Sequence, residues 1–252
     1  MQEQLFLNYG NQINLTTNTI SLKKQATDRV YPSDITRFME KHLPEYMEDI
    51  LNGTLSEGYF RFPRLEAVHN VEPKSLVPFN AVMSLTKNEI AQFPFFHFFV
   101  HDYQSNRAWS HLDDYMPFLL KIGQGIGPDY SMYLGMHPAE AIINCCRNRL
   151  MVFYMQKKGL VIIPNVCFGD EQTLAWAFDG LPEHSILALT SQSCILDNVA
   201  KRSLLNGIHE LIRRKHPELL YVYGHFPEQW KDKFGVEIRT LPTFSSKWRR
   251  IA

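Results

Sequence analysis

The sequence predicts an α/β fold: a mainly parallel sheet in the form of a partial or distorted (β/α) barrel, with a mostly helical N-terminal extension. From Gly58 onward, short apolar runs alternate with helical patterns of about 10–20 residues. Such alternation implies parallel strands joined by right-handed crossovers. The patterned region, residues 58–252, is shorter than the roughly 250 residues of a complete eight-stranded barrel, which favours a partial barrel or an open sheet.

The chain is predicted to divide into an N-terminal arm and helical extension, residues 1–57, and a single α/β domain, residues 58–252. Residues 1–30 are polar and weakly patterned, which is typical of a loose arm or an edge hairpin. From Ser33, which suits an N-cap, apolar residues recur at helical spacing up to Met47. Pro44 should kink or split this helix, and Gly53 should end it.

The helix over 137–158 has the clearest pattern of the α/β domain. Pro138 suits its first turn and Gly159 its C-terminal end. A second helix, over 105–120, places Trp109, Leu112 and Met116 on one face. Three shorter or later helices are expected over 171–178, 196–215 and 227–234. The expected strands cover 76–83, 95–102, 123–127, 160–168, 185–191, 219–223 and 236–241.

Composition excludes several classes of protein. The 252 residues include 26 Lys plus Arg and 26 Asp plus Glu, and 45% are hydrophobic, so the chain is an ordinary folded protein without the overall charge of a nucleic-acid binder. No secretory signal opens the sequence, and no apolar run reaches the ~18 residues of a membrane span. We therefore expect a cytoplasmic protein without membrane contact and with four reduced cysteines.

Polar residues follow the predicted strands, where parallel α/β folds bind their ligands. Asp102 and Asp129 are of most interest, because carboxylates from adjacent strands could hold Mg²⁺ or Mn²⁺. His101 and His225 could add ligands or act as a base, which makes these four the candidate catalytic residues. The alternative is structural: the aspartates cap helices or bind loop amides, and the histidines only pack. His97, between phenylalanines, is predicted to be a core histidine.

Five residues are candidates for binding substrate: Arg147, Tyr103, Ser131, Asn165 and Ser191. Arg147 falls on the core face of the helix over 137–158, where a guanidinium needs a buried acidic partner or a bound anion. It could pair with Asp129, or it could bind a phosphate or carboxylate of the substrate.

Other patterns are weaker. The glycines between Gly123 and Gly127 resemble a dinucleotide loop, but Pro128 and Asp129 follow where a helix should open. No P-loop, nucleophile elbow, HExxH or CxxC occurs. Cys167, at a strand end, fits a packed thiol better than a nucleophile. The basic and aromatic tail over 244–250 could touch nucleic acid, or it could be a solvated tail.

Six motifs occur in an order that resembles a known family. They are Phe96-His-Phe-Phe-Val-His-Asp-Tyr-Gln104, Gly127-Pro-Asp-Tyr-Ser131, Arg147-Asn-Arg149, Val161-Ile-Ile-Pro-Asn165, Phe178-Asp-Gly-Leu-Pro182 and Val222-Tyr-Gly224. Over about residues 60–245 the chain resembles the domain of unknown function 4417 family. The resemblance implies an association with bacteria, phages and other mobile elements, and it implies no activity.

Two functions are compatible with these observations. The first is a metal-dependent hydrolase of a phosphate- or sugar-containing substrate, such as a nucleotide or nucleic acid, with metal-bound water as nucleophile and Arg147 stabilising charge. The second is a non-catalytic factor of a phage or mobile element that binds nucleic acid or protein. A homodimer formed through the N-terminal segment is compatible with either.

Overall fold

A computed structural model describes residues 54–192, 194–195 and 197–243. Most of the predicted N-terminal extension, including the helix from Ser33, lies outside the described residues, as does the basic tail over 244–250. The division at residue 57 thus stays a prediction. None of the described helices is long and apolar enough to cross a membrane.

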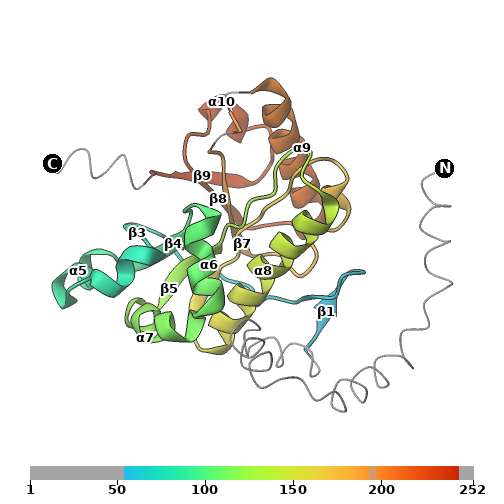
Figure 1. The fold of residues 1–252 in the computed structure, drawn as a ribbon. Helices are drawn as coiled ribbons and strands as arrows, with labels where there is room; N and C mark the ends of the chain where they lie inside the picture. The colour runs from blue at the N-terminus through green and yellow to red at the C-terminus, as the bar shows by residue number, and fades with distance from the viewer. Residues whose placement is uncertain (1–53, 193, 196, 244–252) are drawn as a thin grey trace, which may run out of the picture. The chain divides into compact units, whose positions relative to one another are not determined.

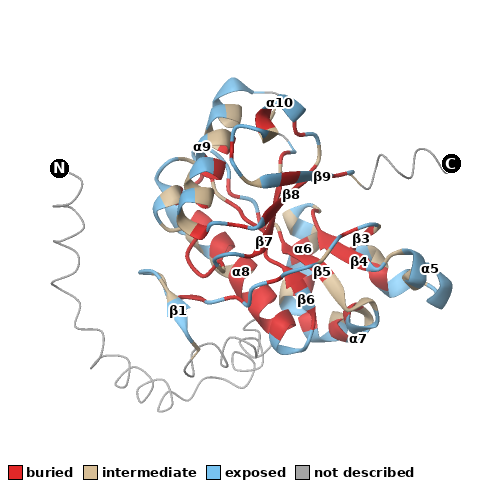
Figure 2. Cartoon of the chain, turned by 180° about the vertical axis from the view of Figure 1, so that it is seen from behind, coloured by how far each residue is buried: buried red, intermediate tan, exposed pale blue. Residues whose placement is uncertain are grey.

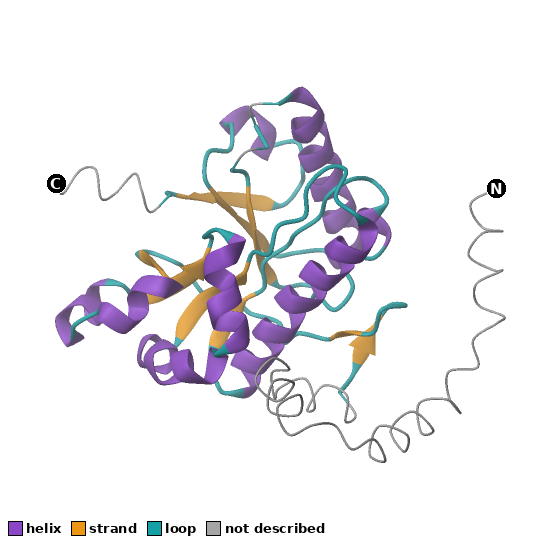
Figure 3. Ribbon diagram, in the orientation of Figure 1, coloured by secondary structure: helices purple, strands orange, loops and turns teal. Residues whose placement is uncertain are grey.

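Within the described residues, seven parallel strands follow one another in chain order (Figures 1 and 3). One sheet contains β3 (Leu76–Pro78), β4 (Phe95–Phe98), β5 (Gln124–Pro128) and β6 (Val161–Ile163), and a second contains β7 (Ile186–Thr190), β8 (Leu219–Tyr223) and β9 (Glu237–Leu241). A parallel bridge between Asn165 and Ala188 connects the two sheets just beyond β6. There, the amide of Val166 donates to the carbonyl of Ala188 at 2.7 Å.

The helices connect the strands as crossovers. They are α5 (Lys87–Gln92), α6 (Asp102–Ser110), α7 (Leu112–Ile122), α8 (Pro138–Lys157), α9 (Asn198–Lys215) and α10 (Glu228–Lys231), with 3-10 helices η1 (Phe79–Ser84) and η2 (Thr173–Ala175). Pro138 begins α8 as predicted, after the N-cap His137. The Asp197 carboxylate caps α9 by accepting the amides of Val199 and Ala200. An antiparallel hairpin, β1 (Ser56–Glu57) and β2 (Phe62–Pro63), precedes the parallel strands.

Most of the parallel strands are buried on both faces (Figure 2), whereas β9 exposes Glu237, Arg239 and Thr240. The larger core packs one face against the helices. On the other face, alternate residues of each strand form a second, smaller core. In that core the rings of His97 and Phe99, from the β4 region, lie 5.1 and 4.3 Å from the ring of Tyr223 at the end of β8. The two connected sheets therefore curve until β4 and β8 face each other. The first and last of the parallel strands, β3 and β9, do not pair with each other.

The predicted α/β class and parallel sheet are confirmed, while several predicted elements were too long. The strand predicted over 76–83 ends at Pro78, because Phe79 and Val82 are buried at the three-residue spacing of the helix η1. The helix predicted over 105–120 is two helices, α6 and α7. They are separated at His111, whose φ of −139° is not helical. Neither α5 nor the β1–β2 hairpin was predicted.

Candidate functional site

A cleft of about 1460 Å³ lies at the carboxyl ends of the strands from β3 to β8. Segments that follow different strands contribute to it, as the rule for parallel α/β folds leads one to expect. Five of the predicted site residues line this cleft: His101, Asp102, Tyr103, Asp129 and Ser131. The structure thus brings together the loops after β4 and β5, which carry both aspartates.

Asp129 follows β5 and is held through one carboxylate oxygen. Its Oδ1 accepts a hydrogen bond from Asn165 Nδ2 at 2.8 Å and one from the Cys167 thiol at 3.1 Å. Burial raises the pKa of the Asp129 carboxyl, the negative charge of Asp102 raises it further, and the two hydrogen bonds oppose this rise. Asp129 consequently keeps its proton to a higher pH than an ordinary aspartate, which suits a general acid or base.

Asp102 begins α6 and joins the loop after β4 to the loop after β5. Its carboxylate accepts the backbone amide of Ser131 at 3.2 Å and the Ser131 hydroxyl at 3.1 Å. It thus binds a loop amide, as the structural alternative predicts, and it also lines the cleft. His101 is the N-cap residue of α6, but its side chain makes no capping bond, and its ring stacks on Tyr103 at 5.9 Å.

A buried polar network connects helix α8 to Asp129 through Cys167. Asn148, on α8, accepts the amide of Tyr130 at 2.8 Å and donates to the Cys167 sulfur at 3.3 Å. Burial and the neighbouring Asp129 charge raise the pKa of Cys167 well above that of an ordinary thiol. Cys167 therefore donates a hydrogen bond as a thiol, which favours the packing role over the nucleophile.

Asn165 links this network to the sheet. Its Nδ2 also donates to the carbonyl of Pro128 at 3.1 Å, so one amide group fixes both the end of β5 and the Asp129 carboxylate. Its Oδ1 is buried and has no hydrogen-bond partner among the described residues. Asn165, predicted to bind substrate, thus acts on Asp129 in this structure and is not among the residues that line the cleft.

His225 and Ser191 meet through the backbone. The buried Ser191 hydroxyl donates to the carbonyl of His225 at 2.7 Å, while the His225 side chain is exposed and outside the cleft lining. Arg147 also lies outside that lining. Its guanidinium stacks on the rings of Trp109 and Tyr130, at 5.6 and 5.2 Å, and it forms no ion pair with a described residue. Roles for these three residues in catalysis or binding stay predictions.

The buried arginine of α8 is Arg149, which is 1% exposed. It donates to the carbonyls of Asp179, Ala177 and Asn165, at 3.0, 2.6 and 3.4 Å. Arg149 therefore fixes the backbone at Asn165, whose side chain holds Asp129. No feature of the sequence distinguished it from Arg147.

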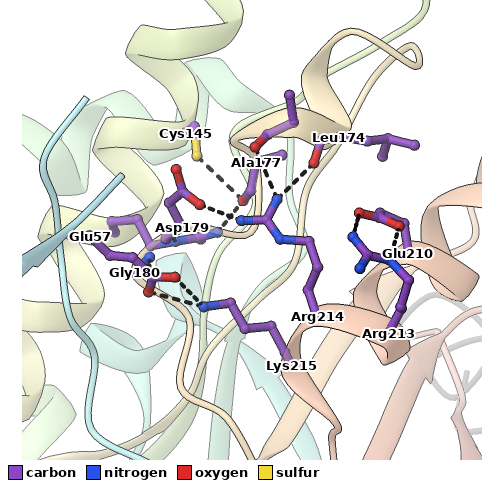
Figure 4. A network of polar contacts seen from close by, with 12 residues as sticks. Glu57, Cys145, Leu174, Ala177, Asp179, Gly180, Glu210, Arg213, Arg214 and Lys215 are labelled. Atoms are coloured by element: carbon purple, nitrogen blue, oxygen red, sulfur yellow. Dashed lines mark hydrogen bonds and ion pairs between the residues drawn. The ribbon is translucent and has the colours of Figure 1, made fainter. Parts of the chain in front are cut away.

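Two ion pairs connect the end of α9 to Asp179 and to Glu57 (Figure 4). Arg214 donates to the Asp179 carboxylate at 2.5 Å, and Lys215, which is 2% exposed, pairs with Glu57 at 2.7 Å. The Glu57 carboxylate also accepts the amide of Gly180 at 3.0 Å. The Lys215–Glu57 pair attaches the β1–β2 hairpin to the end of α9.

His97 lies at the floor of the cleft, although it was not predicted to be part of the site. It is 1% exposed, which confirms the prediction of a core histidine. Its Nδ1 accepts the amide of Phe99 at 3.1 Å. Burial lowers the pKa of His97 to about 3, so the ring stays neutral at physiological pH.

The metal prediction rests on Asp102 and Asp129 alone. In the part of the chain that the structure describes, no three His, Cys, Asp or Glu side chains come together as a metal site. Both carboxylates already accept hydrogen bonds from protein donors. Binding of Mg²⁺ or Mn²⁺ at Asp102 and Asp129 therefore stays a prediction.

The fold and cleft define an α/β domain with paired carboxylates at the ends of its parallel strands. The family described as Domain of unknown function (DUF4417) matches residues 55–242, and the chain belongs to this family, which confirms the resemblance of the six motifs.

Two phage proteins are similar to this chain. The Gene 1 protein of Mycobacterium phage D29 is 30% identical over 155 residues, which cover 61% of this chain and 57% of that protein. The Gene 1 protein of Mycobacterium phage L5 is 31% identical over 154 residues, 61% of this chain and 67% of that protein. The expected association with phages is thus confirmed, and no solved structure matches the chain.

Proposed function

We propose that the cleft is the active site of a hydrolase that acts on a sugar-containing substrate. One observation carries the proposal: Asp129, a carboxylic acid with a raised pKa, lines a large cleft beside a second carboxylate, Asp102. Enzymes that cleave glycosidic bonds commonly use two carboxyl groups in unlike environments, one as proton donor and one as base or nucleophile.

Asp129 acts as the general acid. It donates its proton to the oxygen of the leaving group as the bond between that oxygen and the sugar carbon breaks. Asp102, which accepts hydrogen bonds from the amide and hydroxyl of Ser131, stabilises the positive charge that develops on the sugar. Water then supplies the hydroxyl of the new sugar end, and its proton restores Asp129.

A phosphate-containing substrate fits the cleft less well. None of the described residues that line it is a lysine or an arginine, so the Asp102 carboxylate would face the phosphate without a compensating lysine or arginine charge. The phosphate form of the proposal therefore depends on the Mg²⁺ or Mn²⁺ predicted at Asp102 and Asp129. A non-catalytic binding factor is the alternative, and the experiment below distinguishes the two.

The test measures release of reducing ends from a panel of oligosaccharides and polysaccharides, with Asp129→Asn as the key variant. The wild type should hydrolyse at least one member. Asp129→Asn should be slower by about 10²–10⁴-fold, the usual effect of a general acid, while its melting temperature changes by only a few degrees. Asp232→Asn, at an exposed carboxylate next to α10, is the matched control and should keep full activity. Equal activity in Asp129→Asn, or no hydrolysis by the wild type, would refute the proposal.

A further inference from the structure

We infer that the substrate is an uncharged oligosaccharide, whose rings stack on Tyr103 and Tyr133 at the mouth of the cleft. This inference rests on the proposed function and adds the class of substrate.

Two exposed tyrosines lie in the wall of the cleft. Tyr103, in the first turn of α6, is 68% exposed, and Tyr133, in the loop before α8, is 57% exposed. Large aromatic side chains are usually buried, so two in one concave surface indicate a binding site. The C–H groups on the face of a sugar ring carry a partial positive charge, which the negative face of an aromatic ring attracts.

Both tyrosines are held next to the carboxylates. Tyr103 directly follows Asp102, and its ring stacks on the ring of His101 with the two centroids 5.9 Å apart. Tyr133 comes two residues after Ser131, whose amide and hydroxyl donate to Asp102. The Asp102–Ser131 contact therefore joins the two segments that carry these tyrosines. The ionised Asp102 carboxylate lines the same cleft and only accepts hydrogen bonds, which suits the hydroxyl donors of a sugar.

Charge and size narrow the substrate class. The described lining contains Asp102 and Asp129 and no lysine or arginine, so it is unfavourable for a nucleic acid, with one negative charge on each nucleotide. An uncharged saccharide carries no such penalty. The cleft volume of about 1460 Å³ exceeds the roughly 300–1,000 Å³ of a typical small-molecule site, so it has room for more than one ring.

The experiment measures binding by calorimetry on the Asp129→Asn variant of the full chain, so that the ligand is not consumed. The probes are the uncharged hexasaccharides of glucose in α- and β-linkage, of xylose and of N-acetylglucosamine, together with hexathymidylate. We expect at least one hexasaccharide to bind and hexathymidylate to show no binding. Tyr103→Ala should lower the affinity for the hexasaccharide by about five- to tenfold. Tyr103→Phe should keep the wild-type affinity, because the ring face remains.

Tyr59→Ala is the matched control, since Tyr59 is 78% exposed and does not line the cleft. It should leave the affinity unchanged. Binding of hexathymidylate in preference to every saccharide would overturn the inference, as would equal affinities in Tyr103→Ala and Tyr59→Ala, or no binding of any hexasaccharide. Binding that depends on Tyr103, without hydrolysis by the wild type, would instead refute the proposed hydrolase and leave the saccharide site standing.

Discussion

His97 makes the stability of this protein depend on pH in a way that can be calculated. Its pKa is about 3 in the folded protein and about 6.5 in an unfolded chain. Between these values the unfolded chain binds the additional proton, so folding stability is complete above pH 6.5 and is lost as the pH falls. At pH 5 the difference from the unfolded pKa is about 1.5 units, which corresponds to a loss of about 2 kcal/mol relative to pH 7.

The perturbation is His97→Asn, which keeps an acceptor near the amide of Phe99 but cannot titrate. The assay is urea denaturation at pH 7 and pH 5. Replacement should destabilise the protein at pH 7, because packing against Tyr223 is lost, and should reduce the acid-dependent loss by about 2 kcal/mol. His225→Asn, at an exposed histidine, controls for removal of an imidazole. An unchanged pH dependence in His97→Asn would refute the reasoning.

Three further predictions concern the buried network. Cys167→Ala should cost about 1–2 kcal/mol and raise the pKa of Asp129, whose hydrogen bond from the thiol lowers it; a lowered pKa in an NMR titration would contradict this. Glu57→Gln should cost about 2–3 kcal/mol in urea denaturation, because Lys215 is left buried without a countercharge, and Lys215→Met in the same chain should recover part of the loss. If the double variant is less stable than both the wild type and Glu57→Gln, the buried charge of Lys215 is not the cause of the lost stability. Arg149→Met should cost about 3 kcal/mol or more, since three carbonyls lose their donor, and a melting temperature within a degree of the wild type would disprove that role.

Strands such as β7 and β8 could be predicted because they are buried on both faces and appear as continuous apolar runs, whereas β9 has three exposed polar residues. The strand predicted over 219–223 coincides with β8, and those over 185–191 and 236–241 extend past β7 and β9 by only a residue at one or both ends. Knowing where strands end is enough to place Asp102 and Asp129 at one edge, and both line the cleft.

The support of Asp129 could not be predicted, because it comes from contacts between distant segments. Helix α8 is buried around most of its circumference from Asn148 onward, so helical periodicity does not tell Arg149 from Arg147. The Ser191 contact uses the backbone carbonyl of His225, which every residue type possesses. Asn165 holds Asp129 because β6 pairs in parallel with β5, so the segments that follow the two strands lie side by side, and spacing along the sequence does not show which strands pair.

The proposed hydrolysis requires that burial beside Asp102 makes Asp129 a proton donor in the cleft. The most direct measurement is a titration of the Asp129 carboxyl carbon by NMR in the wild type and in Asp102→Asn. We expect a wild-type midpoint above the ordinary aspartate value of 3.8, and a lower midpoint in Asp102→Asn, because a neighbouring negative charge is removed. A wild-type midpoint at or below 3.8 would contradict the claim.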